Sequence, residues 1–205
     1  MRILLTGVTG FIGKVLIQEL LRQNFSVSVI VRNRSNQLPD IVTQFILGDF
    51  GSNPDFSSSL VNIDCVIHLA GRAHIIDNNE ASALKSFRQI NTNTTLGLAK
   101  QAVAAKVKRF IYLSSIRVNG NQTEVPFLET DTPNPQESYA LSKYEAEQGL
   151  LKLSEHSFLE VVIVRPPLVY GRNAPGNFGK LVRWVESKNN VPLPLGAVHN
   201  IRSVI

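Results

Sequence analysis

The sequence predicts an α/β protein in which a doubly wound parallel sheet carries helices on both faces. Short apolar strands alternate with helical segments along most of the 205 residues. Several of these strands are apolar on both faces, which is typical of strands covered by helices on each side. A glycine-rich segment also follows the first strand directly, and phosphate-binding turns occupy that place in sheets of this kind.

Six strands are expected where short runs are rich in apolar and β-branched residues. They fall at residues 3–6, 27–31, 44–47, 65–69, 109–113 and 160–164. The first helix is expected from Phe11 onward, because Ile12, Leu16 and Leu20 lie four residues apart on one face. Further helices are expected at residues 81–105, 138–154 and 178–187. Ligands of such sheets bind at the carboxyl ends of the strands.

The regular alternation loosens after the sixth strand, and Pro192, Pro194 and Gly196 indicate irregular chain near the end. We therefore expect a nucleotide-binding domain at residues 1–170. Residues 171–205 are expected to be the start of a smaller, substrate-binding lobe.

Composition argues against several classes of protein. The net charge of +5 comes without a Lys/Arg run, so no nucleic-acid partner is expected. No apolar run approaches the ~20 residues of a membrane span, so no membrane association is expected. The one cysteine, Cys65, excludes a disulfide framework and a cysteine-based zinc site, and the four histidines lack metal-ligand spacing. We expect a cytoplasmic protein without a metal.

The first motif with chemical meaning is a Gly-x-x-Gly-x-x-Gly between the first strand and the first helix. Gly7 allows a tight turn, Gly10 lets backbone approach a pyrophosphate, and Gly13 lets the helix pack close to the strand. The helix then presents free N–H groups and a partial positive charge to the phosphates. The alternative is a glycine-rich turn without a ligand. The residues expected to bind a dinucleotide are Gly7, Thr9, Gly10, Phe11, Ile12 and Gly13.

The end of the second strand bears on the choice of cofactor. An acidic residue there would favour the free 2′-hydroxyl of NAD, but the sequence has Arg32 and Arg34. Both arginines suit the 2′-phosphate of NADP, or both are solvated surface residues. Asp49 and Phe50 follow the third strand, where contacts with adenine are expected. The cofactor is therefore expected to be NAD or NADP.

The third motif pairs Tyr139 with Lys143, four residues apart on one helix face. A lysine ammonium beside a phenol lowers its pKa and makes it a usable acid and base. Tyr139 is expected to take a proton from a hydroxyl as hydride leaves the same carbon, and Lys143 also to hold the nicotinamide ribose. Ser115, at the end of the fifth strand, is expected to hydrogen-bond the reacting oxygen.

Together these motifs resemble the extended short-chain dehydrogenases/reductases, specifically the NAD-dependent epimerase/dehydratase family with its Rossmann-like fold. The resemblance covers essentially the whole chain and includes the segments 68–71, 91–95, 113–115 and 165–171. It implies that Leu69, Ala70, Gly71, Asn91 and Pro166 lie beside the cofactor. It also implies that Asn177 and Arg202, together with Ser115, contact the substrate.

The sequence departs from the family's pattern in four ways, of which the missing acid at Arg32 is described above. Thr94 stands where the family often has glycine, and Asn119 replaces a frequent tyrosine at a position that can face substrate. Family members also run about a hundred residues further, through the rest of the substrate lobe. The chain is therefore expected to be a fragment that binds the cofactor but turns over poorly.

The resemblance implies an enzyme that performs redox chemistry at C4 of a UDP-sugar, as UDP-glucose 4-epimerase does. A one-way NADPH-dependent reduction of a UDP-4-keto-sugar remains open and suits Arg32 better. A non-catalytic nucleotide-binding protein is the third alternative, although intact Ser115, Tyr139 and Lys143 argue against it. Dehydration is disfavoured, because Ile116 and Arg117 occupy the place of the acid/base pair it needs. A homodimer through the helices at 81–105 and 138–154 is also left open.

Overall fold

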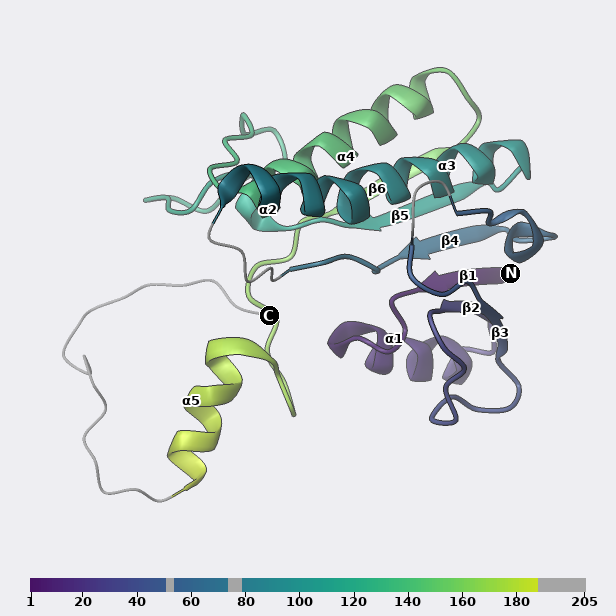
Figure 1. Cartoon of the computed structure of the whole chain (residues 1–205), viewed down its shortest axis with the longest axis horizontal. Coiled ribbons are helices and arrows are strands. Elements are labelled where there is room, and N and C mark those ends of the chain that lie inside the picture. The colour runs from purple at the N-terminus through teal and green to yellow at the C-terminus, as the bar shows by residue number, and fades with distance from the viewer. Residues whose placement is uncertain (51–53, 74–78, 188–205) are drawn as a thin grey trace. The chain divides into compact units, whose positions relative to one another are not determined.

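The computed structural model describes residues 1–50, 54–73 and 79–187. Within them, six strands form one sheet, and every neighbouring pair is parallel (Figure 1). The strands are β1 (Arg2–Thr6), β2 (Ser26–Val31), β3 (Thr43–Ile46), β4 (Cys65–His68), β5 (Arg109–Leu113) and β6 (Glu160–Val164). Their order in the sheet is β3-β2-β1-β4-β5-β6. The predicted fold class and strands are thereby confirmed, with strand ends shifted by one residue at most.

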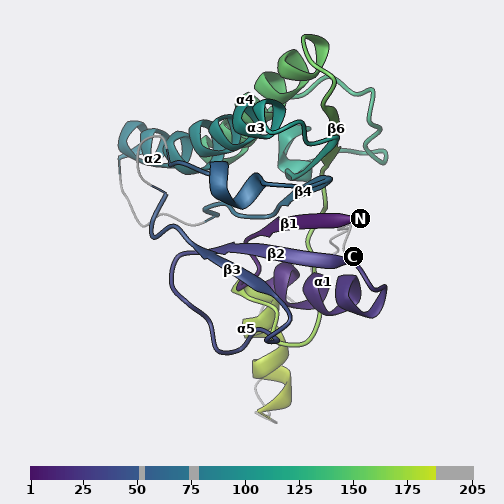
Figure 2. The same ribbon diagram turned by 90° about the vertical axis from the view of Figure 1, so that its right-hand side faces the viewer.

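Helices cover both faces of this sheet. Helix α1 (Phe11–Arg22), which joins β1 to β2, lies on one side (Figure 2). Helices α3 (Thr94–Ala104) and α4 (Ser138–Glu155) lie on the other side. The chain therefore changes side between the two central strands, β1 and β4, and such a switch point is where ligands bind in open α/β sheets.

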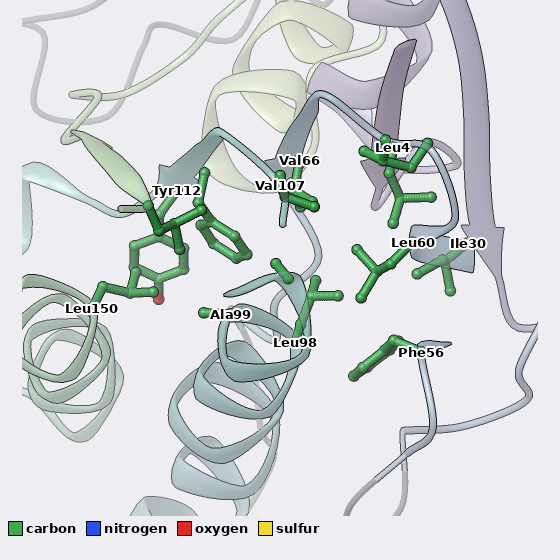
Figure 3. Packing of buried hydrophobic residues seen from close by; sticks show 14 of the residues in the cluster. Leu4, Ile30, Phe56, Leu60, Val66, Leu98, Ala99, Val107, Tyr112 and Leu150 are labelled. Atoms are coloured by element: carbon green, nitrogen blue, oxygen red, sulfur yellow. The ribbon is translucent and has the colours of Figure 1, made fainter. Parts of the chain in front are cut away.

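Successive side chains of β1 point to opposite faces of the sheet, so this strand contributes to the hydrophobic cluster on each face. Ile3 and Leu5 pack with Ile17 of α1, whereas Leu4 between them packs in the cluster on the opposite face. Figure 3 shows this second cluster, in which Leu4 lies with residues of α3 and α4 such as Leu98. A fully buried strand must be apolar at both alternating positions, so the continuous apolar runs follow directly from the two-sided cover.

The segment expected as one long helix at residues 81–105 differs from the prediction in its middle. It consists of α2 (Glu80–Phe87), a π-helical segment η2 (Arg88–Asn93) and α3. Side chains hold the wider turn: Thr92 Oγ1 donates to the carbonyl of Ser142 at 2.8 Å, and Thr94 Oγ1 donates to the carbonyl of Gln89 at 3.0 Å. Single π turns inside α-helices are frequent at functional sites.

The chain divides into two compact units, the first comprising Met1–Arg165 and the second beginning at Pro166. In the second unit the described part contains α5 (Gly176–Glu186), close to the helix expected at 178–187. The ring of Tyr170 lies 5.7 Å from that of Phe178 within this unit. Among the described residues, no helix has both the length and the apolar character that a membrane span requires.

Candidate active site

The turn between β1 and α1 is tightly folded and leaves no room for side chains. Gly7 has a φ of +73°, and a Cβ there would stand 2.6 Å from the backbone nitrogen of Ala70, in the loop after β4. A Cβ on Gly13 would stand 2.2 Å from the carbonyl oxygen of Gly7. Gly10 closes the turn by donating its N–H to the same oxygen at 3.0 Å. The loops after β1 and β4 therefore touch, with only glycine fitting between them.

This turn fits a dinucleotide. It lies at the switch point of the sheet, and it opens a twelve-residue helix that has no acidic residue in its first turn. Free backbone N–H groups and the positive end of the helix dipole are thus available to a pyrophosphate. Of the other residues expected here, Thr9 is exposed in the turn, and Phe11 and Ile12 begin α1 half-buried.

No acidic residue follows β2 directly, but the structure brings one close to that strand end from beyond β3. Arg32 follows β2, and its Nη1 lies 3.5 Å from a carboxylate oxygen of Asp49, which follows β3. Both side chains are largely exposed. The signal was the parallel pairing of β2 with β3, because residues beyond the ends of paired strands become neighbours. Phe50 packs edge-on against Phe56 of the core.

Beneath the glycine turn runs a chain of buried hydrogen bonds. Ala70 N–H donates to Thr6 Oγ1 at 3.2 Å, Thr6 Oγ1 lies 2.7 Å from His68 Nδ1, and His68 Nε2 lies 3.0 Å from Thr95 Oγ1. Because Thr95 donates its proton to the carbonyl of Asn91 at 2.7 Å, it must accept from Nε2 of His68. Nδ1 is then the acceptor of the Thr6 proton. Burial lowers the pKa of His68 to about 3, so the ring is neutral.

Asn91, on the π-helical segment, braces the loop after β4 against α4. Its Nδ2 donates to the carbonyl of Arg72 and to Ser142 Oγ, both at 3.0 Å, and its Oδ1 accepts the N–H of Arg72 at 2.8 Å. Ser142 Oγ in turn donates to the carbonyl of Tyr139 at 2.7 Å. The hydrogen bonds beneath the glycine turn therefore continue to the helix that carries Tyr139.

Lys143 is 4% exposed and reaches back toward the sheet. Its Nζ donates to the carbonyl of Leu113 at 2.9 Å and stands 4.7 Å from the ring centroid of Tyr112. A Cβ on Gly71 would lie 3.0 Å from the same Nζ, so the loop after β4 passes directly beside it. Burial lowers the pKa of Lys143 to about 8, against the opposite effect of the Glu147 carboxylate. The ammonium is thus placed where the loops of β4 and β5 meet.

Ser115 and Tyr139 come together at the carboxyl end of β5. Ser115 caps the short 3-10 helix η3 (Ile116–Val118), with its Oγ accepting the N–H of Arg117 at 3.3 Å. Tyr139 lies in the first turn of α4, half-buried and edge-on to Phe87. Burial raises the pKa of the Tyr139 phenol, while a hydrogen bond with Ser115 and the charge of Arg117 act to lower it. The sequence named Lys143 as the cation for this effect and missed Arg117.

A largely buried ion pair lies one helical turn beyond Lys143. Glu147 is fully buried and accepts hydrogen bonds from Arg165 Nε at 3.0 Å and Nη2 at 2.5 Å. Arg165 Nη1 donates to Asn119 Oδ1 at 3.1 Å. Within the described part of the chain, Asn119 Nδ2 and Ser114 Oγ are buried without a hydrogen-bond partner. Asn119, noted as a departure from the family, is therefore held by its oxygen with its amide protons free.

The structure gathers most of the residues expected at the site within the first unit. Those it brings together around the ends of β1, β4 and β5 are Gly7, Gly10, Gly13, Leu69, Ala70, Gly71, Asn91, Ser115, Tyr139 and Lys143. Pro166 and Asn177 belong to the second unit, and Arg202 lies outside the described residues. Over the described ranges, no cluster of three His, Cys, Asp or Glu residues is arranged to hold a metal.

Comparisons with known proteins agree with this architecture. MoeE5, solved in complex with UDP-glucose and NAD, superposes with a TM-score of 0.79 at 25% identity, over 92% of this chain and 62% of its own. UDP-glucuronic acid 4-epimerase from Bacillus cereus, solved with NAD, gives 0.79 at 27% identity, over 92% and 64%.

The sequence relatives point the same way. UDP-glucose 4-epimerase from Vibrio cholerae is 44% identical over 207 residues, which cover 99% of this chain and 62% of that enzyme. This chain thus spans less than two thirds of the relative's length. The sequence model of the NAD dependent epimerase/dehydratase family matches residues 3–194. The chain therefore belongs to the NAD-dependent epimerase/dehydratase family.

Proposed function

We propose that this chain carries the cofactor-binding and proton-transfer part of an NAD-dependent UDP-sugar 4-epimerase. The observation that carries the proposal is the meeting of Ser115 and Tyr139 at the end of β5, with Lys143 one helical turn further on. This arrangement stands beside a glycine turn that fits a dinucleotide. The 44% identity to the UDP-glucose 4-epimerase of Vibrio cholerae supports the choice of reaction and substrate class.

The glycine turn and the start of α1 would hold the pyrophosphate of NAD, and Lys143 would hold the nicotinamide ribose. When bound, NAD supplies the acceptor and later the donor of the hydride at C4 of the sugar. Lys143 is preorganised for its part, because the carbonyl of Leu113 already fixes its ammonium. Asn91 keeps the loop after β4 close to that ammonium through its hydrogen bonds to Arg72.

The proton of the C4 hydroxyl would pass to the oxygen of Tyr139 as the C–H bond breaks, and would return when hydride re-enters from the other face. Ser115 would donate a hydrogen bond to the same sugar oxygen and stabilise the charge that develops there. No net proton or electron is gained or lost over a full cycle. Tyr139 thus acts as base in one half of the reaction and as acid in the other.

The Arg32–Asp49 pair supports NAD over NADP. A carboxylate 3.5 Å from the guanidinium offsets its charge and would repel a 2′-phosphate, whereas it can accept a hydrogen bond from a free hydroxyl. MoeE5 and the Bacillus cereus enzyme were both solved with NAD. A second candidate function is an NADPH-dependent reductase of UDP-4-keto-sugars, which the exposed Arg32 and Arg34 favour because they could bind the 2′-phosphate.

We also propose a cytoplasmic location. Cys65 is a free, buried thiol whose burial raises its pKa to about 11, and unpaired thiols are typical of reducing compartments.

Cofactor binding followed by a half-reaction tests the function. Bound nucleotide is released and identified, and NAD, NADH, NADP and NADPH are titrated by calorimetry. The NAD-loaded chain is then mixed with UDP-glucose, and the absorbance of reduced nicotinamide is followed beside a Tyr139→Phe control. The expected result is slowly exchanging NAD that the sugar reduces in the wild type and does not reduce in Tyr139→Phe. A tenfold or greater preference for NADPH, about 1.4 kcal/mol, would favour the reductase.

A further inference from the structure

Arg117 lies between the two groups expected to contact the reacting oxygen. It is the second residue of η3, and its backbone N–H donates to Ser115 Oγ at 3.3 Å. Its guanidinium forms an ion pair with the carboxylate of Glu137. Glu137 is the N-cap residue of α4 and stands two positions before Tyr139. Arg117 therefore links the turn of Ser115 to the start of the helix that carries Tyr139.

The other groups around Tyr139 do not replace this cation. Lys143, on the same helix, directs its ammonium to the carbonyl of Leu113 and the face of Tyr112. Phe87, from α2, contributes an uncharged ring edge. Tyr112, from β5, is buried and neutral in its ordinary state, since burial raises its pKa further. The guanidinium of Arg117 is accordingly the positive charge that opposes the effect of burial on the Tyr139 phenol.

Glu137 determines where that charge stands. The side chains of Arg117 and Glu137 are 52% and 43% exposed, so neither is forced into place by the core. Without the carboxylate, a half-exposed arginine would be free to extend into water, where its field at Tyr139 would be screened. The ion pair keeps the guanidinium near the first turn of α4 instead, and the carboxylate offsets part of its charge there.

We propose that Arg117 is a positioning residue that holds Ser115 and Tyr139 together and supplies the positive charge that stabilises the ionised form of Tyr139. The inference rests on the proposed function for its meaning, because it concerns the group expected to move the proton. This role of Arg117 is separate from that of Lys143, which we propose binds the nicotinamide ribose.

Spectroscopic titration of the phenolate tests the inference without any turnover. The chain has four tyrosines, and the difference between the titration curves of the wild type and Tyr139→Phe assigns the step of Tyr139. Arg117→Gln is expected to move this step upward by about half to one pH unit, the size expected for one partly screened charge nearby. Arg117→Lys is expected to restore most of the shift, because it restores the charge.

A matched control removes a positive charge from the start of β5, the strand whose carboxyl end leads to Ser115 and Arg117. Arg109, at the start of β5, forms an exposed ion pair with Glu160, so Arg109→Gln is expected to leave the step of Tyr139 where it is. Circular dichroism over the same pH range confirms that each variant remains folded. An unchanged step in Arg117→Gln, or a lysine variant that does not restore it, would overturn the inference.

The pH dependence of the half-reaction gives a second readout. If Tyr139 is the base, the rate of nicotinamide reduction rises with pH as the phenol ionises, and Arg117→Gln is expected to shift that rise upward by the same amount. Failure of the proposed function would appear as absence of the half-reaction in the wild type. The phenolate titration would still decide the role of Arg117.

Discussion

His68 makes the stability of the fold depend on pH in a way that can be calculated. The ring is buried, and both of its nitrogens are engaged, Nδ1 with Thr6 and Nε2 with Thr95. Burial lowers its pKa from the ordinary 6.5 to about 3. Between these two values the unfolded chain binds a proton that the folded chain does not, so the free energy of unfolding must fall as the pH is lowered.

The expected slope is about 1.4 kcal/mol per pH unit once the pH is well below 6.5. Acidification from pH about 6.5 to about 4.5 should therefore cost between 2 and 3 kcal/mol, roughly a quarter of the stability of an ordinary domain. The loss ends near pH 3, where the folded ring also takes up a proton. Because other groups titrate in the same range, the quantity to compare is the difference between the wild type and His68→Gln.

Urea unfolding followed by circular dichroism at four pH values measures this difference. The wild type is expected to lose stability relative to His68→Gln as the pH falls, with the slope given above. His156→Gln, at the exposed C-terminal end of α4, serves as the control for the loss of a histidine outside the core. A difference between the wild type and His68→Gln that does not change with pH would refute the reasoning, because the folded ring would then protonate as easily as a free one.

Three further substitutions test other parts of the first unit. Lys143→Met is expected to raise the free energy of unfolding near neutral pH, because the wild type must bury a charged lysine there. The difference from the wild type should vanish between pH about 8 and 10.5, where Lys143 is protonated only in the unfolded chain. Urea unfolding of both proteins across this pH range measures the difference. Glu147→Gln should cost about 3 kcal/mol by leaving a largely buried guanidinium without its carboxylate, whereas Glu160→Gln, from an exposed pair, should cost much less in the same assay. Gly13→Ala should weaken NAD binding at least about tenfold in calorimetry, because its Cβ would strike the turn's backbone, whereas Gly97→Ala, in open space on α3, should bind as the wild type does.

The elements that could be predicted are those whose pattern is local. Each strand is a short apolar run, and α1 repeats its apolar residues at helical spacing, so their existence and order follow from the chain alone. The π-helical turn at Arg88–Asn93 was not predicted, because its side chains follow the same helical period as their neighbours. What widens the turn is contact with α4, through the hydrogen bonds of Asn91 and Thr92 to Ser142, about fifty residues away.

The candidate site divides in the same way. Helical spacing places Tyr139 and Lys143 on one face of α4, and the glycine turn can be recognised within eight residues. The partners of these groups come from other strands and could not be foreseen. Lys143 reaches the carbonyl of Leu113 only because α4 packs on β5, and Arg117 finds Glu137 only because the chain returns to the same edge of the sheet.

The hydrogen bonds beneath the glycine turn connect that turn to the helix that carries Tyr139, although the two motifs are far apart in the sequence. Thr6 ends the first strand. The path from it runs through His68 and Thr95 of α3 to Asn91 on the π-helical segment, and then to Ser142 and the backbone of Tyr139. Each intermediate group accepts one bond and donates the next, so rotating any of them breaks at least two contacts. Every link lies within the first unit. The position of the Tyr139 phenol relative to the glycine turn should therefore be a property of that unit, and substitutions at His68 should disturb cofactor binding and phenol ionisation together.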